Sequence, residues 1–383
     1  MRIRRLLESE AAATAGRDAV SMASTFDDAL MERWRERIAQ GTVWGLERGG
    51  SVLGHCRLLP SEHLFGGRAV PTLDIAAVAV PPEHRGQGVA RAMMEAAVAY
   101  GTEQGFGLSL LFPATTAMYR KLGWEHAGSW SRYRVPTAAV PGLGPVMRVG
   151  DAEGDWEAIR ACRERSVRAL SGPAVRSEER WDALGRAPYR FVLDAPEPGT
   201  VLEAYALVRQ RTTPGDWRHV VVLEDWAATS RQGLEAVAGL IGRWSTFGSA
   251  AELVDTVPSR LSGVIPEQSL ERAGGLHWMA RGLDLEVAVS ARGFPRGLTA
   301  TVGLEVDGAE GAWRLEVADG RGRLTRTDHG QAWLHTQALG PLFTGFRSPA
   351  ELVLQGLARG PTEALELLGA AFSGPPPVVF DFF

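Results

Sequence analysis

The stretch LDIAAVAV at residues 73–80, continued by PPEHRGQGVARAMM at residues 81–94, decides the fold of the first part of the chain. An apolar run ends at two prolines, and a short loop of arginine and glycine leads into a segment whose apolar residues recur at helical spacing. This order predicts a buried strand, a tight turn and a helix. Gly86 and Gly88 let the backbone approach a ligand closely, and the first helical turn offers free N–H donors. The turn is therefore suited to a pyrophosphate group.

Two common nucleotide-binding patterns do not fit this loop. The chain contains no Walker sequence, and the dinucleotide pattern G-x-G-x-x-G finds Arg91 where its third glycine belongs. What fits is Arg85-x-x-Gly88-x-Ala90, which resembles the Q/R-x-x-G-x-G/A loop of the GNAT acetyltransferases, where it cradles the pyrophosphate of acetyl-CoA. The alternative is an ordinary strand–turn–helix crossover without a ligand.

Composition narrows the functional classes. A chain of 383 residues with 45% hydrophobic and 22% charged residues predicts a globular protein of about two or three domains. The net charge of −4 argues against nucleic acid or an anionic membrane as a partner. The two cysteines, Cys56 and Cys162, offer neither a disulfide framework nor a zinc spacing, and the histidines show no metal spacing. With no apolar leader and no apolar run of roughly 18 residues, we expect a cytoplasmic protein without a metal or a membrane span.

The first domain, expected over residues 1–135, has the element order of an α/β domain with a mixed sheet. A helix should follow Asp27 and Asp28 and stop at Gly41. Further elements are predicted as strands at 42–47, 52–58, 70–80 and 108–112, and as helices at about 89–104 and 117–121.

A second informative string, ATTAMYRKLGW, occupies residues 114–124. In GNAT enzymes, a tyrosine ahead of Phe/Leu-Gly-Phe/Trp lies near the thioester sulfur, and the matching residue here is Tyr119. When an amine attacks a thioester, a thiolate leaves, and a phenol within hydrogen-bond reach can protonate it. The alternative is a buried tyrosine that only packs beside the sheet.

The remainder of the chain predicts two more domains, over residues 146–281 and 282–383. In the second domain, Arg231-Gln-Gly-Leu-Glu resembles a degenerate copy of the first glycine loop, so we expect a duplicated GNAT-like domain that does not bind cofactor. In the third, extended runs at 283–289, 298–306, 311–317 and 331–339 precede helical segments at 350–357 and 362–370. This order resembles a sterol-carrier-protein-like domain, and a lipid site is possible by that analogy.

The chain ends in PPPVVFDFF at residues 375–383, and such an apolar ending predicts a tail packed into the body. A buried α-carboxylate at Phe383 would have a use in amine acetylation. An alkylammonium has a pKa of about 10.4, so the substrate arrives as a cation and must lose a proton before it attacks. A desolvated carboxylate can attract that cation and then accept its proton.

Two GNAT-like units, a sterol-carrier-like third domain and this aromatic terminus together resemble the Eis (enhanced intracellular survival) family over the whole chain. The resemblance implies an acetyl-CoA-dependent N-acetyltransferase that modifies aminoglycosides or polyamine-like amines and assembles as a homohexamer. It implies Tyr119 as general acid and the terminal carboxylate of Phe383 as general base. The implied cofactor contacts are Val78, Ala79, Val80, Arg85, Gly86, Gln87, Gly88, Val89, Ala90, Arg91, Ala114 and Thr115. Phe112 and Ala114 depart from the family, whose best-known member has His or Ser there, which affects the expected substrate range.

Substrate contacts are predicted from charge and aromatic character. Asp27, Asp28, Trp34 and Asp381 could line a cavity for an amine, because anionic and aromatic groups favour cations. The alternative is a charge pair at a helix start and a core tryptophan. Two other functions stay open, which are acetylation of lysine or peptide amines and a non-catalytic scaffold that binds a lipid or a partner.

Overall fold

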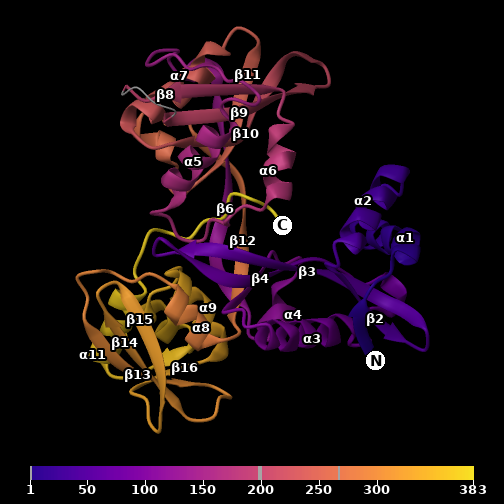
Figure 1. Ribbon diagram of the computed structural model, residues 1–383, viewed down its shortest axis with the longest axis vertical. Coiled ribbons are helices and arrows are strands. Elements are labelled where there is room, and N and C mark those ends of the chain that lie inside the picture. Colours follow the sequence, from indigo (N-terminus) through magenta and orange to yellow (C-terminus); the bar gives the residue numbers. More distant parts are fainter. Residues whose placement is uncertain (1, 197–200, 266–267) are drawn as a thin grey trace. The chain divides into compact units, whose positions relative to one another are not determined.

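The computed structural model describes residues 2–196, 201–265 and 268–383, and the described chain forms two compact units (Figure 1). The first unit contains residues 2–127, 278–373 and 383, and the second contains residues 128–277 and 374–382. Segments 2–127 and 278–373 thus share one compact unit.

The first part of the first unit is a mixed sheet with helices. Its elements are β1 (Arg2–Arg5), α1 (Ala11–Met22), α2 (Asp28–Ala39), β2 (Val43–Arg48), β3 (Ser51–Phe65), β4 (Arg68–Ala79), α3 (Val89–Glu103), β5 (Leu108–Leu111) and α4 (Thr116–Arg120). The strands pair in the order β1-β2-β3-β4-β5, with residues 279–282 of β12 (Glu271–Gly282) antiparallel to β5. β4 and β5 are parallel and are joined by α3, which is the strand–turn–helix unit that the sequence predicts.

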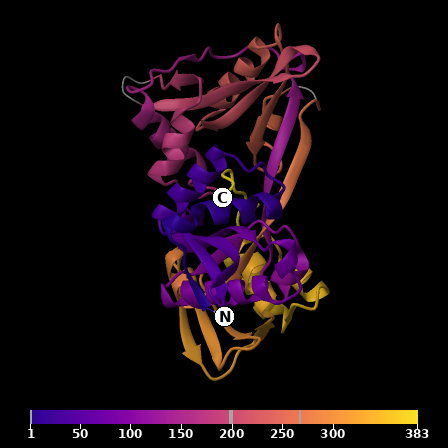
Figure 2. The same ribbon diagram turned by 90° about the vertical axis from the view of Figure 1, so that its right-hand side faces the viewer.

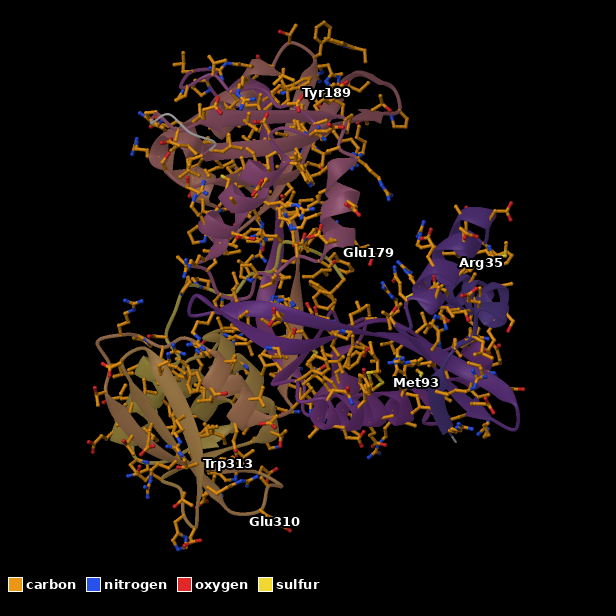
Figure 3. All side chains as sticks on the ribbon, viewed as in Figure 1. Arg35, Met93, Glu179, Tyr189, Glu310 and Trp313 are labelled. Atoms are coloured by element: carbon orange, nitrogen blue, oxygen red, sulfur yellow. The ribbon has the colours of Figure 1, made fainter. Side chains whose placement is uncertain are left out.

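Packing places α3 on one face of this sheet. Met93 is fully buried in a core with Leu73 and Ile75 of β4, whereas Arg35 of α2 is exposed (Figure 3). Since successive residues of a strand point to opposite faces, Thr72 and Asp74 of β4 point away from α3. A second core joins α1 and α2 to the start of β2, and its members are Leu6, Ala11, Ala15, Leu30, Trp34, Ile38 and Val43.

The second part of the first unit is a smaller sheet with helices. Its elements are α8 (Leu285–Ala291), β13 (Ala300–Val306), β14 (Ala312–Ala318), β15 (Arg321–Thr327), β16 (Ala332–Leu334), α9 (Thr336–Thr344), α10 (Pro349–Leu354), β17 (Ala358–Arg359) and α11 (Thr362–Ala371). The strand order is β15-β14-β13-β16-β17.

Two predictions for this region are wrong. Residues 283–289 were expected to be extended, but Asp284 caps the start of helix α8 by accepting hydrogen bonds from the N–H groups of Glu286 and Val287, both at 3.0 Å. Residues 331–339 form only the short strand β16, after which α9 begins because His335 accepts the N–H of Gln337. In both places a side-chain cap starts a helix within an apolar segment whose pattern alone does not separate strand from helix.

The second unit repeats the mixed-sheet plan (Figure 2). Its elements are β6 (Glu125–Pro136), which begins in the first unit, β7 (Arg148–Val149), α5 (Trp156–Val167), α6 (Glu178–Gly185), β8 (Tyr189–Asp194), β9 (Leu202–Thr213), β10 (Asp216–Ala228), α7 (Arg231–Arg243) and β11 (Gly248–Asp255). The strands pair in the order β6-β11-β10-β9-β8-β7. β10 and β11 are parallel and are joined by α7, as β4 and β5 are joined by α3. Alternate residues of β9 pack against α7 on one face of the sheet and against α5 and α6 on the other face. Helices therefore cover both faces of this sheet.

Candidate active site

Strand β4 is irregular near its end, where the sequence predicts contacts with the cofactor. Its pairing with β5 ends at Ile75 opposite Leu111, and its pairing with β3 shifts register between Ala76 and Ala79. Ala77 has a φ of 48°, a left-handed conformation that is uncommon outside glycine. This geometry is a β-bulge, which re-aims the backbone locally. The predicted cofactor contacts Val78, Ala79 and Val80 therefore lie beyond the point where β4 and β5 stop pairing.

The loop after β4 is built to leave backbone donors available. Gly86 and Gly88 have φ values of 75° and 78°, and a Cβ atom at either position would meet nothing within 4 Å. Gly88 is the N-cap of α3 and provides no side-chain hydrogen bond to it. The N–H groups of the first helical turn have no intrahelical acceptor, so those of Val89, Ala90 and Arg91 are available to a ligand.

Two side chains of the loop form hydrogen bonds with nearby backbone carbonyls. Nε of Arg85 donates to the carbonyl of Val80 at 2.9 Å, and Nε2 of Gln87 donates to the carbonyl of Glu83 at 2.9 Å. A helix N-terminus with free amides favours an anion, and the exposed arginine side chains add positive charge. The residues present therefore fit the pyrophosphate of acetyl-CoA.

Tyr119 is the predicted general acid, and α4 holds it in the core of the first unit. Its side chain is 4% exposed, and its ring packs edge-on against Trp124 with centroids 6.2 Å apart. Burial, with a smaller contribution from Cys56, raises the pKa of Tyr119 to about 12. The phenol therefore keeps its proton at neutral pH, as a donor to a leaving thiolate must. Ala114 and Thr115, which precede α4, are exposed.

Phe383 belongs to the same unit as Tyr119. Its ring lies 5.2 Å from the ring of Phe112, the residue directly after β5, and 6.1 Å from the imidazole of His63. The chain runs from Phe112 through the exposed residues at 114–115 into α4. The last residue of the sequence thus packs on the residue that follows β5, four residues before α4 begins.

His63 and Asp74 form a buried pair that the sequence analysis did not select. Nε2 of His63 lies 2.9 Å from Oδ2 of Asp74, and Oγ1 of Thr72 lies 3.3 Å from Oδ1. The imidazole also contacts Phe383. The available signal was Asp74 itself, because a carboxylate in an otherwise apolar strand requires a partner.

Three of the predicted substrate residues are engaged elsewhere. Trp34 is 0% exposed in the core of α1 and α2, with the guanidinium of Arg37 5.0 Å from its ring, so it presents no surface to a ligand. Asp27 is the N-cap of α2 and accepts the N–H of Leu30 at 2.7 Å. Asp381, in the second unit, has its charge neutralised by Arg176 and Arg180. Core packing of Trp34 and ion pairing of Asp381 correct the charge and aromatic argument for these two residues, whereas Asp27 is exposed despite its capping bond. Asp28 is exposed.

In the described part of the second unit, the turn that corresponds to the glycine loop is closed. At the start of α7, Oγ of Ser230 accepts the N–H of Gly233 at 3.0 Å, so the helix caps itself. A Cβ at Gly233 would lie 2.7 Å from the carbonyl of Glu203, which makes this glycine a packing residue.

The remaining features concern the binding of lipids, the binding of metal ions and membrane-spanning helices. An apolar cavity of about 40 Å³ lies in the first unit among residues that include Leu285, Val306, Leu342 and Phe372. That volume is far below the 300–1,000 Å³ of typical ligand pockets. Within the described residues, no group of His, Cys, Asp and Glu side chains could hold a metal ion. No helix among them is long and apolar enough to cross a bilayer.

Comparisons with known proteins agree with this geometry. Residues 2–127 match the family model for the acetyltransferase (GNAT) domain, and residues 285–380 match the model for the sterol carrier protein domain. The chain is 27% identical over 367 residues to the N-acetyltransferase Eis of Mycobacterium tuberculosis, covering 88% of each protein.

Solved structures show the same fold. A GCN5-related N-acetyltransferase from Anabaena variabilis matches with a TM-score of 0.92 at 24% identity, covering 100% of both chains. Eis1 from Mycobacterium abscessus matches with a TM-score of 0.79 at 21% identity, again over 100% of both chains. The predicted fold, GNAT-type sheets followed by a sterol-carrier-like segment, is confirmed. GNAT acetyltransferases use acetyl-CoA as acetyl donor. The chain carries a GNAT acetyltransferase domain and is an acyltransferase, and over most of its length it is similar to the Eis N-acetyltransferases.

Proposed function

We propose that the chain transfers an acetyl group directly from acetyl-CoA to amines of aminoglycosides or polyamine-like molecules. The observation that carries the proposal is the shared location of two groups in the first unit. Tyr119 is buried with its pKa raised to about 12, and Phe383 packs on Phe112 at the end of β5. A proton donor and a carboxylate are the two groups that direct amine acetylation needs.

In the proposed reaction, the amine nitrogen attacks the thioester carbonyl, a C–N bond forms and the C–S bond breaks. The hydroxyl of Tyr119 gives its proton to the leaving thiolate. The α-carboxylate of Phe383 accepts the proton that the ammonium must lose. The cofactor contacts in this proposal are the β4 residues Val78 to Val80, the loop and helix start from Arg85 to Arg91, and Ala114 with Thr115.

A direct transfer is favoured over an acyl-enzyme because the cysteines are unsuited to attack. Cys56 and Cys162 are both buried, and burial raises the pKa of each thiol to about 12. A thiol that stays protonated is a poor nucleophile. Sequential kinetics are therefore expected.

The choice of a polycationic amine rests on the Eis resemblance and on exposed acidic residues of α2 such as Asp28 and Glu32. Acetylation of lysine or peptide amines is the alternative acceptor class. The same resemblance supports a homohexamer, which light scattering after gel filtration would test, and the two free cysteines fit a cytoplasmic location.

The experiment is thiol release from acetyl-CoA with a panel of aminoglycosides, polyamines and lysine peptides. Wild type is compared with Tyr119→Phe and with a chain that carries one glycine after Phe383. We expect both variants to lose about 100-fold or more in kcat, because each removes or displaces a proton-transfer group. Tyr100→Phe is the matched control, since Tyr100 also lies in the first unit but packs on Trp44.

Each contrary result has a defined meaning. Full activity of the glycine-extended chain would exclude the terminal carboxylate as base. Full activity of Tyr119→Phe would exclude this phenol as acid. Turnover of lysine peptides alone would replace the aminoglycoside proposal with the peptide alternative.

A further inference from the structure

The sheet of the second unit carries a cavity on the face that points away from α7. Tyr133 of β6, Leu253 of β11 and Leu223 of β10 pack in the core with α7. Because successive residues of a strand point to opposite faces, their neighbours Arg134 and Glu252, which are paired across β6 and β11, point to the other face. Next to α6, that face is hollowed into a cavity of about 390 Å³.

The cavity has the size and the mixed lining of a small-molecule site. Its volume lies within the range of roughly 300–1,000 Å³ that is typical of ligand pockets. All of its lining residues belong to the second unit. Apolar surface comes from Val222 of β10, Val254 of β11 and the half-buried Trp130 of β6. A ligand with an apolar body therefore finds contacts here.

The charged lining is positive. Four arginines and only two glutamates line the cavity, an excess of two positive charges in a chain whose net charge is −4. Nε of Arg209 lies 2.6 Å from Oε1 of Glu224, and Nη2 of Arg211 lies 2.8 Å from Oε2 of Glu252. Arg134 binds the other oxygen of Glu252 at 2.7 Å. Both glutamates are thus already paired with arginines.

The other two lining arginines differ in their partners. Nε of Arg180 donates to Oδ1 of Asp381 at 2.8 Å. Arg132 is exposed, and its side chain has neither a hydrogen bond nor an ion pair among the described residues. Arg132 stands two residues after Trp130 on β6, so the guanidinium and the indole share one face of the strand and line the same cavity. The positive charge without a partner therefore adjoins an aromatic ring.

We propose that this cavity binds a small organic acid, whose carboxylate pairs with Arg132 and whose apolar body packs on Trp130 and the two valines. The planar guanidinium matches a carboxylate through two parallel hydrogen bonds. Glu224 and Glu252 repel a polyanion, so the cavity favours a single carboxylate over the phosphates of acetyl-CoA. The inference does not depend on the proposed acetyl transfer, and it gives the duplicated unit a ligand of its own.

The test is a titration of the full chain with benzoate, which joins one carboxylate to a flat apolar ring. Binding is followed by the indole N–H peaks in a two-dimensional NMR spectrum. The chain has 12 tryptophans, and the peak that is missing in Trp130→Leu belongs to Trp130. Benzoate should shift this peak in wild type. Arg132→Met should bind benzoate about tenfold more weakly, because it loses a charge-assisted hydrogen bond.

Matched controls separate this site from others. Arg168 is an exposed arginine of the same unit that does not line the cavity, so Arg168→Met should bind benzoate as wild type does. Benzylamine has the same ring with the opposite charge and should leave the Trp130 peak in place. Inorganic phosphate lacks the apolar body and should not displace benzoate. Gly88→Ala, which alters the glycine loop of the first unit, should leave benzoate affinity unchanged.

Four results would overturn the proposal. The first is equal benzoate affinity in wild type and Arg132→Met, and the second is an unmoved Trp130 peak up to the solubility of benzoate. The third is an equal shift with benzylamine, which would show that charge does not select the ligand. The fourth is loss of benzoate binding in Gly88→Ala but not in Arg132→Met, which would place the acid at the glycine loop instead.

Discussion

Nε2 of His63 lies 2.9 Å from Oδ2 of Asp74, with both side chains buried on the sheet face away from α3. An ionised carboxylate only accepts hydrogen bonds, so Nε2 of His63 is then the donor. The ring of Phe383 packs against this imidazole. A buried hydrogen-bonded pair thus supports the residue to which we assign the catalytic carboxylate.

Replacing His63 with leucine should destabilise the protein by about 3 kcal/mol, because the carboxylate of Asp74 loses its main partner while it stays buried. Urea unfolding measures the difference. The double variant His63→Leu with Asp74→Leu should recover much of the loss, since neither polar partner is left buried without the other. A single variant as stable as wild type would show that the pair contributes nothing.

The glycine loop gives a matched pair of substitutions. Gly88 and Gly105 flank α3 with φ values of 78° and 75°, and a Cβ at either would meet nothing within 4 Å. Alanine at each position should cost a similar 1–2 kcal/mol or so in stability. Only Gly88→Ala should weaken acetyl-CoA binding, by about tenfold, because it displaces the free amides at the start of α3. Calorimetric titration compares the two. Equal affinities in both variants would contradict the assigned pyrophosphate site.

The second unit should not bind acetyl-CoA, because Ser230 already occupies the N-terminus of α7. Calorimetry should therefore give a stoichiometry of about one acetyl-CoA per chain. A second site that persists in Gly88→Ala would locate binding in the duplicated unit.

The pH dependence of catalysis follows from Tyr119. A general acid works in its protonated form, and the pKa of this phenol is raised to about 12. Activity should therefore not fall through loss of this proton between pH 7 and 10, whereas an ordinary tyrosine with a pKa of about 10 would begin to lose it in that range. The measurement is kcat against pH at saturating substrate. A decline with an apparent pKa near 9 that vanishes in Tyr119→Phe would contradict the assignment.

The pH dependence of stability has a different source, His55. Its side chain is fully buried against Trp34, and burial, with the charges of Arg17 and Arg37, lowers its pKa to about 3. The unfolded chain, with a pKa of about 6.5 for histidine, binds the proton more readily. The free energy of unfolding should therefore fall as pH drops below about 6.5, by about 1.4 kcal/mol per pH unit from this group.

The variant His55→Leu isolates that contribution. Its urea unfolding free energy should depend less on pH than that of wild type between pH 6.5 and 4.5. Both ring nitrogens of His55 lack a hydrogen-bond partner among the described residues, so leucine leaves no polar group unpaired. Identical slopes in the two proteins would mean that His55 is protonated in the folded state.

Local sequence predicted the elements whose signals are short-range. The apolar run, the prolines and the glycines at residues 73–94 correctly predicted the strand, the turn and α3, because each signal acts within a few residues. Residues 285–291 show where such signals fail. Their β-branched apolar run is compatible with strand or helix, and the helix is decided by the Asp284 cap and by packing, where Ala288 closes on Gly107.

The glycine loop and Tyr119, to which we assign cofactor binding and the acid, were selected from the sequence by itself, since each signal depends on a few neighbouring residues. Tertiary structure alone decided which acids and aromatics face a ligand. Trp34 packs in a core, Asp381 binds arginines more than 200 residues earlier in the chain, and Asp74 pairs with His63 across a hairpin. A buried charge or ring takes whichever partner the fold brings within contact, and that partner is set by strand register and long-range packing rather than by spacing along the chain.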